Sequence, residues 1–311
     1  MIRSTKFEEI RDVTAPDGLD ACLPLGSKLG LDQLQVTTGG GATNAAVTFS
    51  RLGLKAACIT RVGQDLAGEE VARELKRERV AANFVQIDDE LHTATSIIFV
   101  AGTGHRAILT FRGAANALSA KQIPWNKLNS RWFYITGLGG NLKLIGQIMD
   151  AAKKCGAKVA WNPGNGELVL GLKKLAPLLK QTAVLIMNRE EAAALTNLPP
   201  RHLHDIIKKL KPFGLDVLAI TDGQRGAYLQ ADNKTVFTPA LKGKRVNTTG
   251  AGDAFGSGLV AALTKEYDIS DALKVAMLNA TSVVCHMGAK AGILHKIPAR
   301  IELAKVKINQ I

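Results

Sequence analysis

The residues best suited to chemistry lie in one stretch near the C-terminus, Asn247–Gly258, which contains four glycines. Three small residues in succession, Gly250–Gly252, precede an apolar run, Leu259–Leu263, that is typical of a helix. Where a helix begins, unpaired backbone N–H groups and the helix dipole together attract a phosphate. Asp253 would lie beside that phosphate, where a carboxylate can accept the proton of an attacking hydroxyl. The stretch therefore predicts an anion hole followed by a general base.

A plain helix cap is the alternative explanation of Asp253, because aspartate is a good N-cap residue. A cap alone does not require glycine at Gly250, Gly252, Gly256 and Gly258 together. Glycine inside a helix costs up to about 1 kcal/mol relative to alanine, so two of them in the first turns indicate close approach by another backbone or a ligand. We therefore favour the functional interpretation.

A second glycine cluster, Gly39–Gly41, leads into a helix predicted over Thr43–Leu52. Glycines let a polar ligand approach the main chain, and Asn44 offers both donor and acceptor groups to hydroxyls. A plain turn into a helix explains the cluster equally well. Neither G-x-G-x-x-G nor G-x-x-x-x-G-K-[ST] occurs, which disfavours a dinucleotide-binding fold and a P-loop.

Short apolar runs alternate with amphipathic segments along the chain, as buried strands alternate with helices. Five strands are predicted, at Ala57–Val62, Trp132–Thr136, Lys158–Asn162, Ala183–Met187 and Val217–Thr221. Helices are predicted at Thr43–Leu52, Ala67–Arg77, Leu142–Lys154, Glu190–Leu195, Leu203–Leu210 and Ala272–Cys285. This alternation predicts an α/β fold with a largely parallel sheet that is covered on both faces.

Two segments interrupt the alternation, Ala21–Thr37 and Thr95–Arg112, and both are typical of β-hairpins. In the second segment, Ser96–Val100 and Ala107–Phe111 flank a turn at Gly102–Gly104, so we expect them to pair antiparallel. We predict that these segments form a small β-lid outside the main sheet.

Bulk properties limit the class of protein. A chain of 311 residues with 46% hydrophobic composition fits one domain over residues 1–311. The net charge of +13 is spread over helical faces that also carry acidic residues, which argues against nucleic acid as a partner. No secretory signal, membrane span or CxxC pair is present, so we expect a cytoplasmic protein with reduced cysteines and no membrane partner.

Taken together, the two glycine clusters resemble the signatures of the PfkB/ribokinase family of carbohydrate kinases. The first signature is matched at Gly39, Gly40, Ala42, Asn44, Ala46, Gly53 and Gly63, and the second at Thr248, Gly250, Ala251, Gly252, Asp253 and Ser257. Between them, Asn188–Glu191 is similar to the family's N-x-x-E element, and Thr221–Gly226 to its nucleotide loop. The resemblance covers nearly the whole chain and implies a ribokinase-like three-layer αβα fold with a mostly parallel central sheet and a small β-lid.

The resemblance also implies an activity, the ATP-dependent transfer of a phosphoryl group to a hydroxyl of a sugar or sugar-like molecule. Asp253 would be the general base, and Gly250, Ala251 and Gly252 would bind the phosphoryl group. Glu191 would organise water around Mg²⁺, which keeps several waters in most sites, although a helix-cap role explains Glu191 and Asn188 equally well. The other implied contacts are Gly40, Gly41 and Asn44 for the acceptor, and Asn188, Thr221, Gly223, Gly226 and Asn279 for ATP.

The chain departs from the family at its start. The family's first strand carries a Gly and an Asp that hold the acceptor, whereas residues 1–20 are polar and supply no such strand. Either the chain is a truncated version or it holds the acceptor differently. The alternatives to a sugar kinase are accordingly an adenosine-like nucleoside kinase and a catalytically weak member that senses a sugar or nucleotide.

Two further departures concern ligands. Asn247 stands where the family has Asp near a monovalent-cation loop, so Asn247 and Thr249 are candidate ligands for a cation whose role stays open. Gly41 replaces a lysine of ribokinase proper, which disfavours ribose itself. We also expect a homodimer contact through the β-lid.

Overall fold

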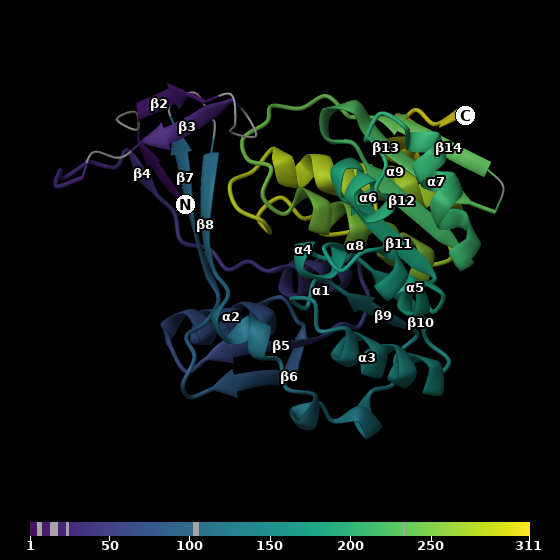
Figure 1. The fold of residues 1–311 in the computed structure, drawn as a ribbon, viewed down its shortest axis with the longest axis horizontal. Coiled ribbons are helices and arrows are strands. Elements are labelled where there is room, and N and C mark those ends of the chain that lie inside the picture. Colours follow the sequence, from purple (N-terminus) through teal and green to yellow (C-terminus); the bar gives the residue numbers. More distant parts are fainter. Residues whose placement is uncertain (5–7, 13–17, 23–24, 102–105, 233) are drawn as a thin grey trace.

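A mixed seven-stranded sheet forms the centre of the molecule. The computed structural model describes residues 1–4, 8–12, 18–22, 25–101, 106–232 and 234–311. The strand order is β15-β14-β13-β12-β11-β10-β9, in which β9 to β12 run parallel and β12 to β15 antiparallel (Figure 1). The strands are β9 (Trp132–Ile135), β10 (Lys158–Trp161), β11 (Val184–Asn188), β12 (Val217–Thr221), β13 (Gly226–Ala231), β14 (Lys234–Pro239) and β15 (Asn309–Gln310).

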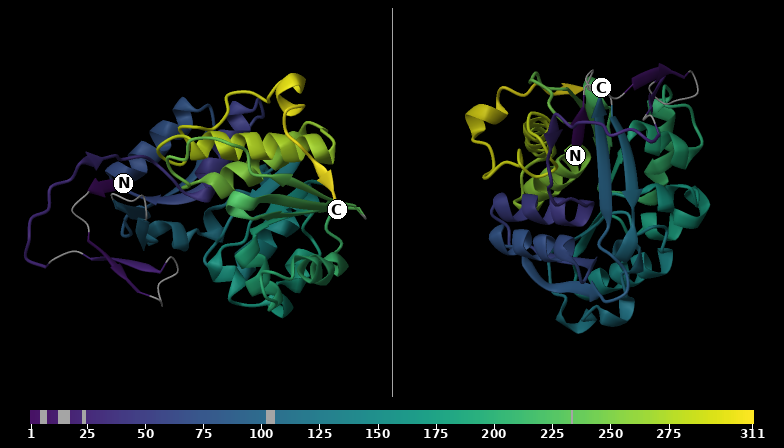
Figure 2. Two further views of the ribbon diagram at one scale, coloured as in Figure 1. Left: turned by 90° about the horizontal axis from the view of Figure 1, so that it is seen from above. Right: turned by 90° about the vertical axis from the view of Figure 1, so that its left-hand side faces the viewer.

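Two hydrophobic cores cover the two faces of this sheet. Successive side chains of a strand point to opposite faces, so Val184 and Ile186 enter one core while Leu185 and Met187 enter the other. The first core contains α8 (Ala251–Thr264) and α9 (Ile269–Val284); the second contains α3 (Leu142–Lys154), α5 (Leu172–Leu179), α6 (Arg189–Thr196) and α7 (Leu203–Leu210). Figure 2 shows these helices on opposite sides of the sheet, which confirms the three-layer αβα architecture.

The predicted strands and helices of the αβ alternation are found with bounds that shift by at most three residues. They include the helices α1 (Gly41–Arg51) and α2 (Leu66–Arg77) and the strand β5 (Ala57–Gly63). Elements that were not predicted include β6 (Ala81–Asp88), β13, β14, β15, α4 (Asn165–Leu168), α5 and α10 (Arg300–Leu303).

A separate four-stranded sheet forms the lid, in the order β4-β1-β7-β8. Strands β7 (Thr95–Ala101) and β8 (Arg106–Phe111) pair antiparallel as predicted, whereas the predicted Gly102–Gly104 turn lies outside the described residues. Their apolar side chains at Ile97, Ile108, Leu109 and Phe111 are exposed.

Short strands that were not predicted lie within residues 1–22. Strand β1 (Ile2–Ser4) pairs with β7 and with β4 (Gln33–Leu34), and β2 (Glu8–Arg11) pairs with β3 (Leu19–Cys22). These strands are two to four residues long and β1 finds its partners far along the chain, so local sequence gives little signal. None of them joins the main sheet among the described residues. The hairpin predicted at Ala21–Thr37 is wrong, because in the described part of the chain β3 and β4 pair with β2 and β1 and not with each other.

The main sheet has an open edge at β9. Strand β9 pairs only with β10, and β5 pairs only with β6 in a separate two-stranded parallel sheet, as far as the described residues show. Helix α1 packs against both β5 and β9. Each strand therefore presents one row of unpaired backbone groups toward the same region.

Two smaller expectations concern the chain as a whole. The four cysteines are free thiols, as predicted, and burial raises the pKa of Cys58 to about 12. Within the described part of the chain, no helix combines the length and the apolar composition that crossing a bilayer requires.

Candidate active site

The N-terminus of α8 is built on glycine. Gly250 is the N-cap and has a φ of 81°, in the left-handed region that glycine tolerates best. A Cβ at this position would lie 2.7–2.9 Å from atoms of Ala289, so a side chain does not fit there. A Cβ on Gly252, by contrast, would meet no protein atom within 4 Å. Gly252 thus leaves open space beside the start of α8, whereas the Ala251 N–H already donates to the Thr248 carbonyl at 3.2 Å.

Asp253 lies in the first turn of α8 and contacts the start of α1. Asn44 Nδ2 donates a hydrogen bond of 2.7 Å to Asp253 Oδ2. A Cβ on Gly41 would lie 3.2 Å from Asp253 Oδ1 and 3.0 Å from Thr136, so glycine lets the two helices approach closely. Burial raises the pKa of Asp253, while the hydrogen bond from Asn44 and the charge of Lys290 oppose that rise.

A cavity of about 240 Å³ brings the predicted residues of several segments together. Its lining includes six of them: Asn188, Glu191, Thr221, Gly250, Gly252 and Asp253. Asn162, Ile186 and Met187 complete the lining and were not predicted as site residues. Asn162 follows a parallel strand directly, which is where polar groups of an α/β site gather, so its position was a usable signal.

The predicted N-x-x-E element begins α6 as a capping box. Asn188 Oδ1 accepts the Glu191 N–H and Glu191 Oε2 accepts the Asn188 N–H, both at 2.8 Å. The helix-cap explanation is therefore confirmed, although both side chains also line the cavity. Burial raises the pKa of Glu191.

The turn after β12 is held by an ion cluster around one buried carboxylate. Gly223 and Gly226 have φ values of 52° and 126°, and a Cβ on Gly226 would collide with the Thr238 carbonyl. The Asp222 carboxylate, 1% exposed, accepts hydrogen bonds from Arg225 at 2.6 and 2.8 Å and also bonds Arg189. Arg189 follows Asn188, so this cluster fixes the N-x-x-E element relative to the predicted nucleotide turn.

Asn279 is placed differently from the other predicted residues. It is completely buried, with Nδ2 donating to the Ala254 carbonyl at 2.8 Å and Oδ1 accepting from Leu294 N–H at 3.0 Å. Its side chain joins α8, α9 and the chain beyond, and it does not line the cavity. In this structure it supports the N-terminal half of α8.

The candidate cation ligands lie just before α8. Asn247 is 7% exposed, and its Oδ1 accepts the Thr249 N–H. Thr249 Oγ1 is buried without a hydrogen-bond partner among the described residues. Of the two candidate cation ligands, Thr249 is therefore the one whose side-chain oxygen has no hydrogen-bond partner among the described residues.

Three further buried polar atoms lack partners in the part of the chain that is described, Asn44 Oδ1, Tyr134 OH and Trp161 Nε1, and the first two concern the surroundings of Asp253. Asn44 contacts Asp253, and a Cβ on Gly256 of α8 would collide with the Tyr134 hydroxyl. A buried polar atom without a partner costs about 1–3 kcal/mol, so both atoms favour a polar ligand or water beside Asp253. Tyr134 was not predicted as a site residue.

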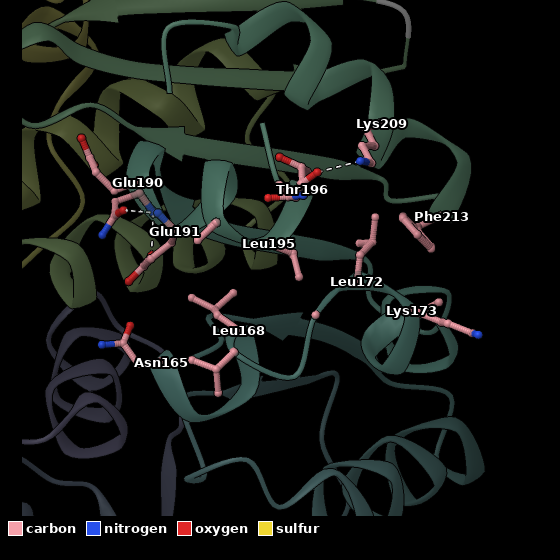
Figure 3. Close-up of a pocket in the computed structure, with 16 residues that line it drawn as sticks. Asn165, Leu168, Leu172, Lys173, Glu190, Glu191, Leu195, Thr196, Lys209 and Phe213 are labelled. Carbon is pink, nitrogen blue, oxygen red and sulfur yellow. Dashed lines mark hydrogen bonds between the residues drawn. The ribbon is translucent and has the colours of Figure 1, made fainter. Parts of the chain in front are cut away.

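A larger hollow of about 1000 Å³ lies between α4–α5 and α6–α7 (Figure 3). Asn188 and Glu191 line it on one side, and the rest is lined by apolar side chains such as Leu168, Leu172 and Phe213 together with polar ones such as Lys173 and Lys209. The other predicted residues do not line it, so the smaller cavity is the candidate active site.

Comparison with known proteins shows the family. The chain matches the pfkB family of carbohydrate kinases over residues 20–296, which is most of its length. It therefore belongs to the PfkB family of carbohydrate kinases, which confirms the resemblance carried by the two glycine clusters and the N-x-x-E element.

Individual relatives include kinases with different acceptors. The chain is 27% identical to a ribokinase of Haemophilus influenzae, covering 83% of this chain and 85% of that protein. It is 24% identical to a nucleoside kinase of Methanocaldococcus jannaschii, covering 86% of each chain. Among solved structures, a putative ribokinase II from E. coli in complex with ATP and Mg²⁺ is similar with a TM-score of 0.75, at 20% identity, covering 91% of this chain and 93% of that one.

Proposed function

We propose that this protein transfers the γ-phosphoryl group of ATP to a hydroxyl of a sugar or sugar-like molecule, with Asp253 as the general base. One observation carries this proposal: Asp253 and the glycine N-terminus of α8 face the same small cavity as Asn188, Glu191 and Thr221. A base, an anion-binding helix end and a predicted nucleotide turn thus meet at one place.

The chain's own groups suffice for positioning and proton transfer. The N–H groups of Gly250 and Gly252 would bind the phosphoryl oxygens, because these two residues line the cavity and lie at the positive end of α8. Ala251, also predicted for this role, does not line the cavity, and its N–H donates to the Thr248 carbonyl at 3.2 Å. Asp253 would accept the acceptor's proton as the hydroxyl attacks phosphorus, and Asn44 would hold the carboxylate in place. Such transfer depends mainly on positioning and charge stabilisation.

Mg²⁺ fits the group at the start of α6. Glu191 brings a carboxylate and Asn188 an amide to the cavity, and oxygen ligands of this kind suit Mg²⁺, which binds few protein groups and keeps several waters. Bound with ATP, the ion would neutralise phosphate charge. We infer that Glu191 and Asn188 hold its water shell while they cap α6.

The acceptor would lie where Gly41, Asn44 and Tyr134 approach Asp253. The free Asn44 Oδ1 and Tyr134 OH can hydrogen-bond hydroxyls of a sugar. A free sugar and a nucleoside both carry such hydroxyls, and relatives named for each are known. A nucleoside kinase is therefore the second candidate.

The deciding experiment is a panel of sugars and nucleosides with Mg-ATP, monitored by ADP formation. Acceptor-dependent ADP formation supports the proposal, and the preferred acceptor separates the two candidates. Thermal stabilisation by a sugar or nucleotide without turnover would instead identify a sensing protein.

Replacing Gly252 by valine tests the anion hole. We expect ATP binding to weaken roughly tenfold or more and turnover to fall, because the branched side chain enters the space where phosphate meets backbone N–H groups. The melting temperature should change little, since no protein atom lies within 4 Å of the added Cβ. Calorimetric ATP titration and thermal melting measure the two effects.

Gly250→Ala, at the same helix N-terminus, is expected to act on stability instead. Its Cβ collides with Ala289 and its φ is unfavourable for alanine, so it should lower the melting temperature. Unchanged ATP binding and rate in Gly252→Val would place the anion hole elsewhere.

A further inference from the structure

A buried lysine lies beside the candidate active site and has no part in the chemistry described so far. The Lys290 side chain is 6% exposed, and its Nζ donates to Thr38 Oγ1 at 2.7 Å and forms an ion pair with Glu74 Oε2 at 2.9 Å. Thr38 also hydrogen-bonds the Glu74 carboxylate. One ammonium thus joins the segment after α9, the helix α2 and the turn that leads into α1.

The segment that carries Lys290 touches both halves of the active site. Ala289 packs against the N-cap Gly250 of α8, and Gly288 packs against Thr37 in the turn before α1. Arg51, at the end of α1, donates at 3.0 Å to the Lys290 carbonyl, and it forms a bidentate ion pair with Glu78 at 2.8 Å. The backbone of this segment therefore has an anchor besides the Lys290 side chain.

The charge of Lys290 also acts on the active site. Against the effect of burial, the Asn44 amide of α1 and the Lys290 ammonium both lower the pKa of Asp253. Besides burial, which is the main cause, the charge of Asp253 in turn raises the pKa of the Tyr134 hydroxyl of β9 and of the Glu191 carboxylate of α6. Of these four, only Lys290 is a cation, and its charge lowers the pKa of Asp253. Burial lowers the pKa of Lys290 itself, and the Glu74 carboxylate opposes that change.

We propose that Lys290 is a positioning residue of the transfer site, which holds the turn before α1 against the N-terminus of α8. This inference rests on the proposed function, because the effect is read through turnover. The hydrogen bond to Thr38 fixes the chain three residues before Gly41, the ion pair with Glu74 ties that turn to α2, and the neighbouring Ala289 packs against Gly250.

The test compares the pH dependence of kcat/KM for the acceptor in Lys290→Gln, Lys290→Arg and Arg51→Gln. In Lys290→Gln the acid limb should move to higher pH, by a shift on the order of half to one unit, because an opposite charge no longer favours ionised Asp253. The acceptor KM should rise several-fold. In Lys290→Arg, which keeps the charge, the acid limb should stay near its original position.

Arg51→Gln is the matched control, since it weakens the same segment without removing a charge that acts on Asp253. It should lower the melting temperature and leave the acid limb in place. An acid limb that does not move in Lys290→Gln, or that moves equally in Arg51→Gln, would overturn the inference. Absence of turnover in the unsubstituted protein would instead contradict the proposed function. If Lys290→Gln does not fold, Lys290→Arg decides alone. The inference is overturned if the acid limb of Lys290→Arg moves as far as loss of the charge would move it. It is supported if that acid limb does not move.

Discussion

Asp253→Asn is expected to lower kcat by about 10²–10⁴-fold while the affinity for ATP changes little, because the substitution removes a base and no phosphate donor. The isosteric amide retains an oxygen that can accept the hydrogen bond from Asn44 Nδ2. The fold should therefore persist. Steady-state kinetics on the preferred acceptor and calorimetric titration with ATP measure the two quantities.

The direction of the pH dependence follows from the environment of Asp253. Burial raises the pKa of this carboxyl group, and the ionised form is the base. Activity should therefore fall as pH drops through a value above the ordinary range of aspartate, and the variant's residual rate should lack that limb. The raised pKa also means that ionised Asp253 destabilises the fold above this pKa, so the variant should melt at the same or a higher temperature at neutral pH.

Asp268→Asn provides a matched control for that variant. Asp268 is the N-cap of α9, where its side chain accepts the Asp271 N–H at 2.9 Å, and asparagine caps helices as well as aspartate does. This variant should retain kcat. Near-normal turnover in Asp253→Asn would remove Asp253 from the mechanism.

The second large effect is expected from a strand added at the open edge of the main sheet. We propose that an N-terminal extension of about 10–15 residues, on the order of one strand and a turn, raises both the melting temperature and the affinity for the acceptor. Within the part of the chain that the structure describes, strands β9 and β5 each have a free edge, and both pack against α1. A parallel strand beside them would pair unpaired backbone groups and bury apolar surface.

The position of Met1 favours such an extension. Asn247 Nδ2 lies 3.5 Å from Met1 Sδ, so the first residue adjoins the loop that leads into α8. The carboxyl ends of β11 and β12 reach the cavity through Asn188 and Thr221. A parallel strand that ends at Met1 would deliver its own carboxyl end to the same side of the sheet, where a polar residue could contact the acceptor.

Thermal melting and the acceptor KM should be compared in the chain with and without the extension. A gain of several kcal/mol corresponds to roughly 5–10 °C in a domain of this size. An extension of equal length with two prolines in the strand is the control, because proline cannot complete the ladder. Equal stability and equal acceptor affinity in all three forms would show that the sheet and the site need no such strand.

Sequence patterns predicted the parallel half of the sheet better than the antiparallel half. Val217–Thr221 is mostly buried and reads as one nearly continuous apolar run, whereas Gly226–Ala231 begins with glycine and contains a polar Gln230, and Lys234–Pro239 is mostly half-buried and ends on proline. Neither antiparallel strand shows a continuous apolar run or a period-two alternation, so the patterns that predict strands are weak there. The lid strand Ile2–Ser4 offered none, since its partner lies almost a hundred residues away.

Site residues that belong to a local sequence motif could be predicted from the sequence. Site residues whose position depends on contacts between distant segments could not. Gly250 and Asp253 belong to a local pattern that dictates a helix start. Lys290 belongs to no sequence motif, and only the structure shows that it is buried in an ion pair with Glu74. Asn279 is buried because α9 approaches Gly258 closely. A Cβ added to Gly258 would lie 3.2 Å from Asn279 Cβ. Local sequence gives no signal for such a contact between two helices.

Three helices begin around the same point, since α1 starts beside Asp253, α6 at Asn188 and α8 at Gly250. Each N-terminus is equivalent to about half a positive charge. The empty pocket should therefore attract small oxyanions in general, so sulfate or phosphate buffers will compete with the nucleotide. Assays of this protein are best run in chloride with an uncharged or cationic buffer, and inhibition that grows with sulfate but not with chloride at equal ionic strength would report this field directly.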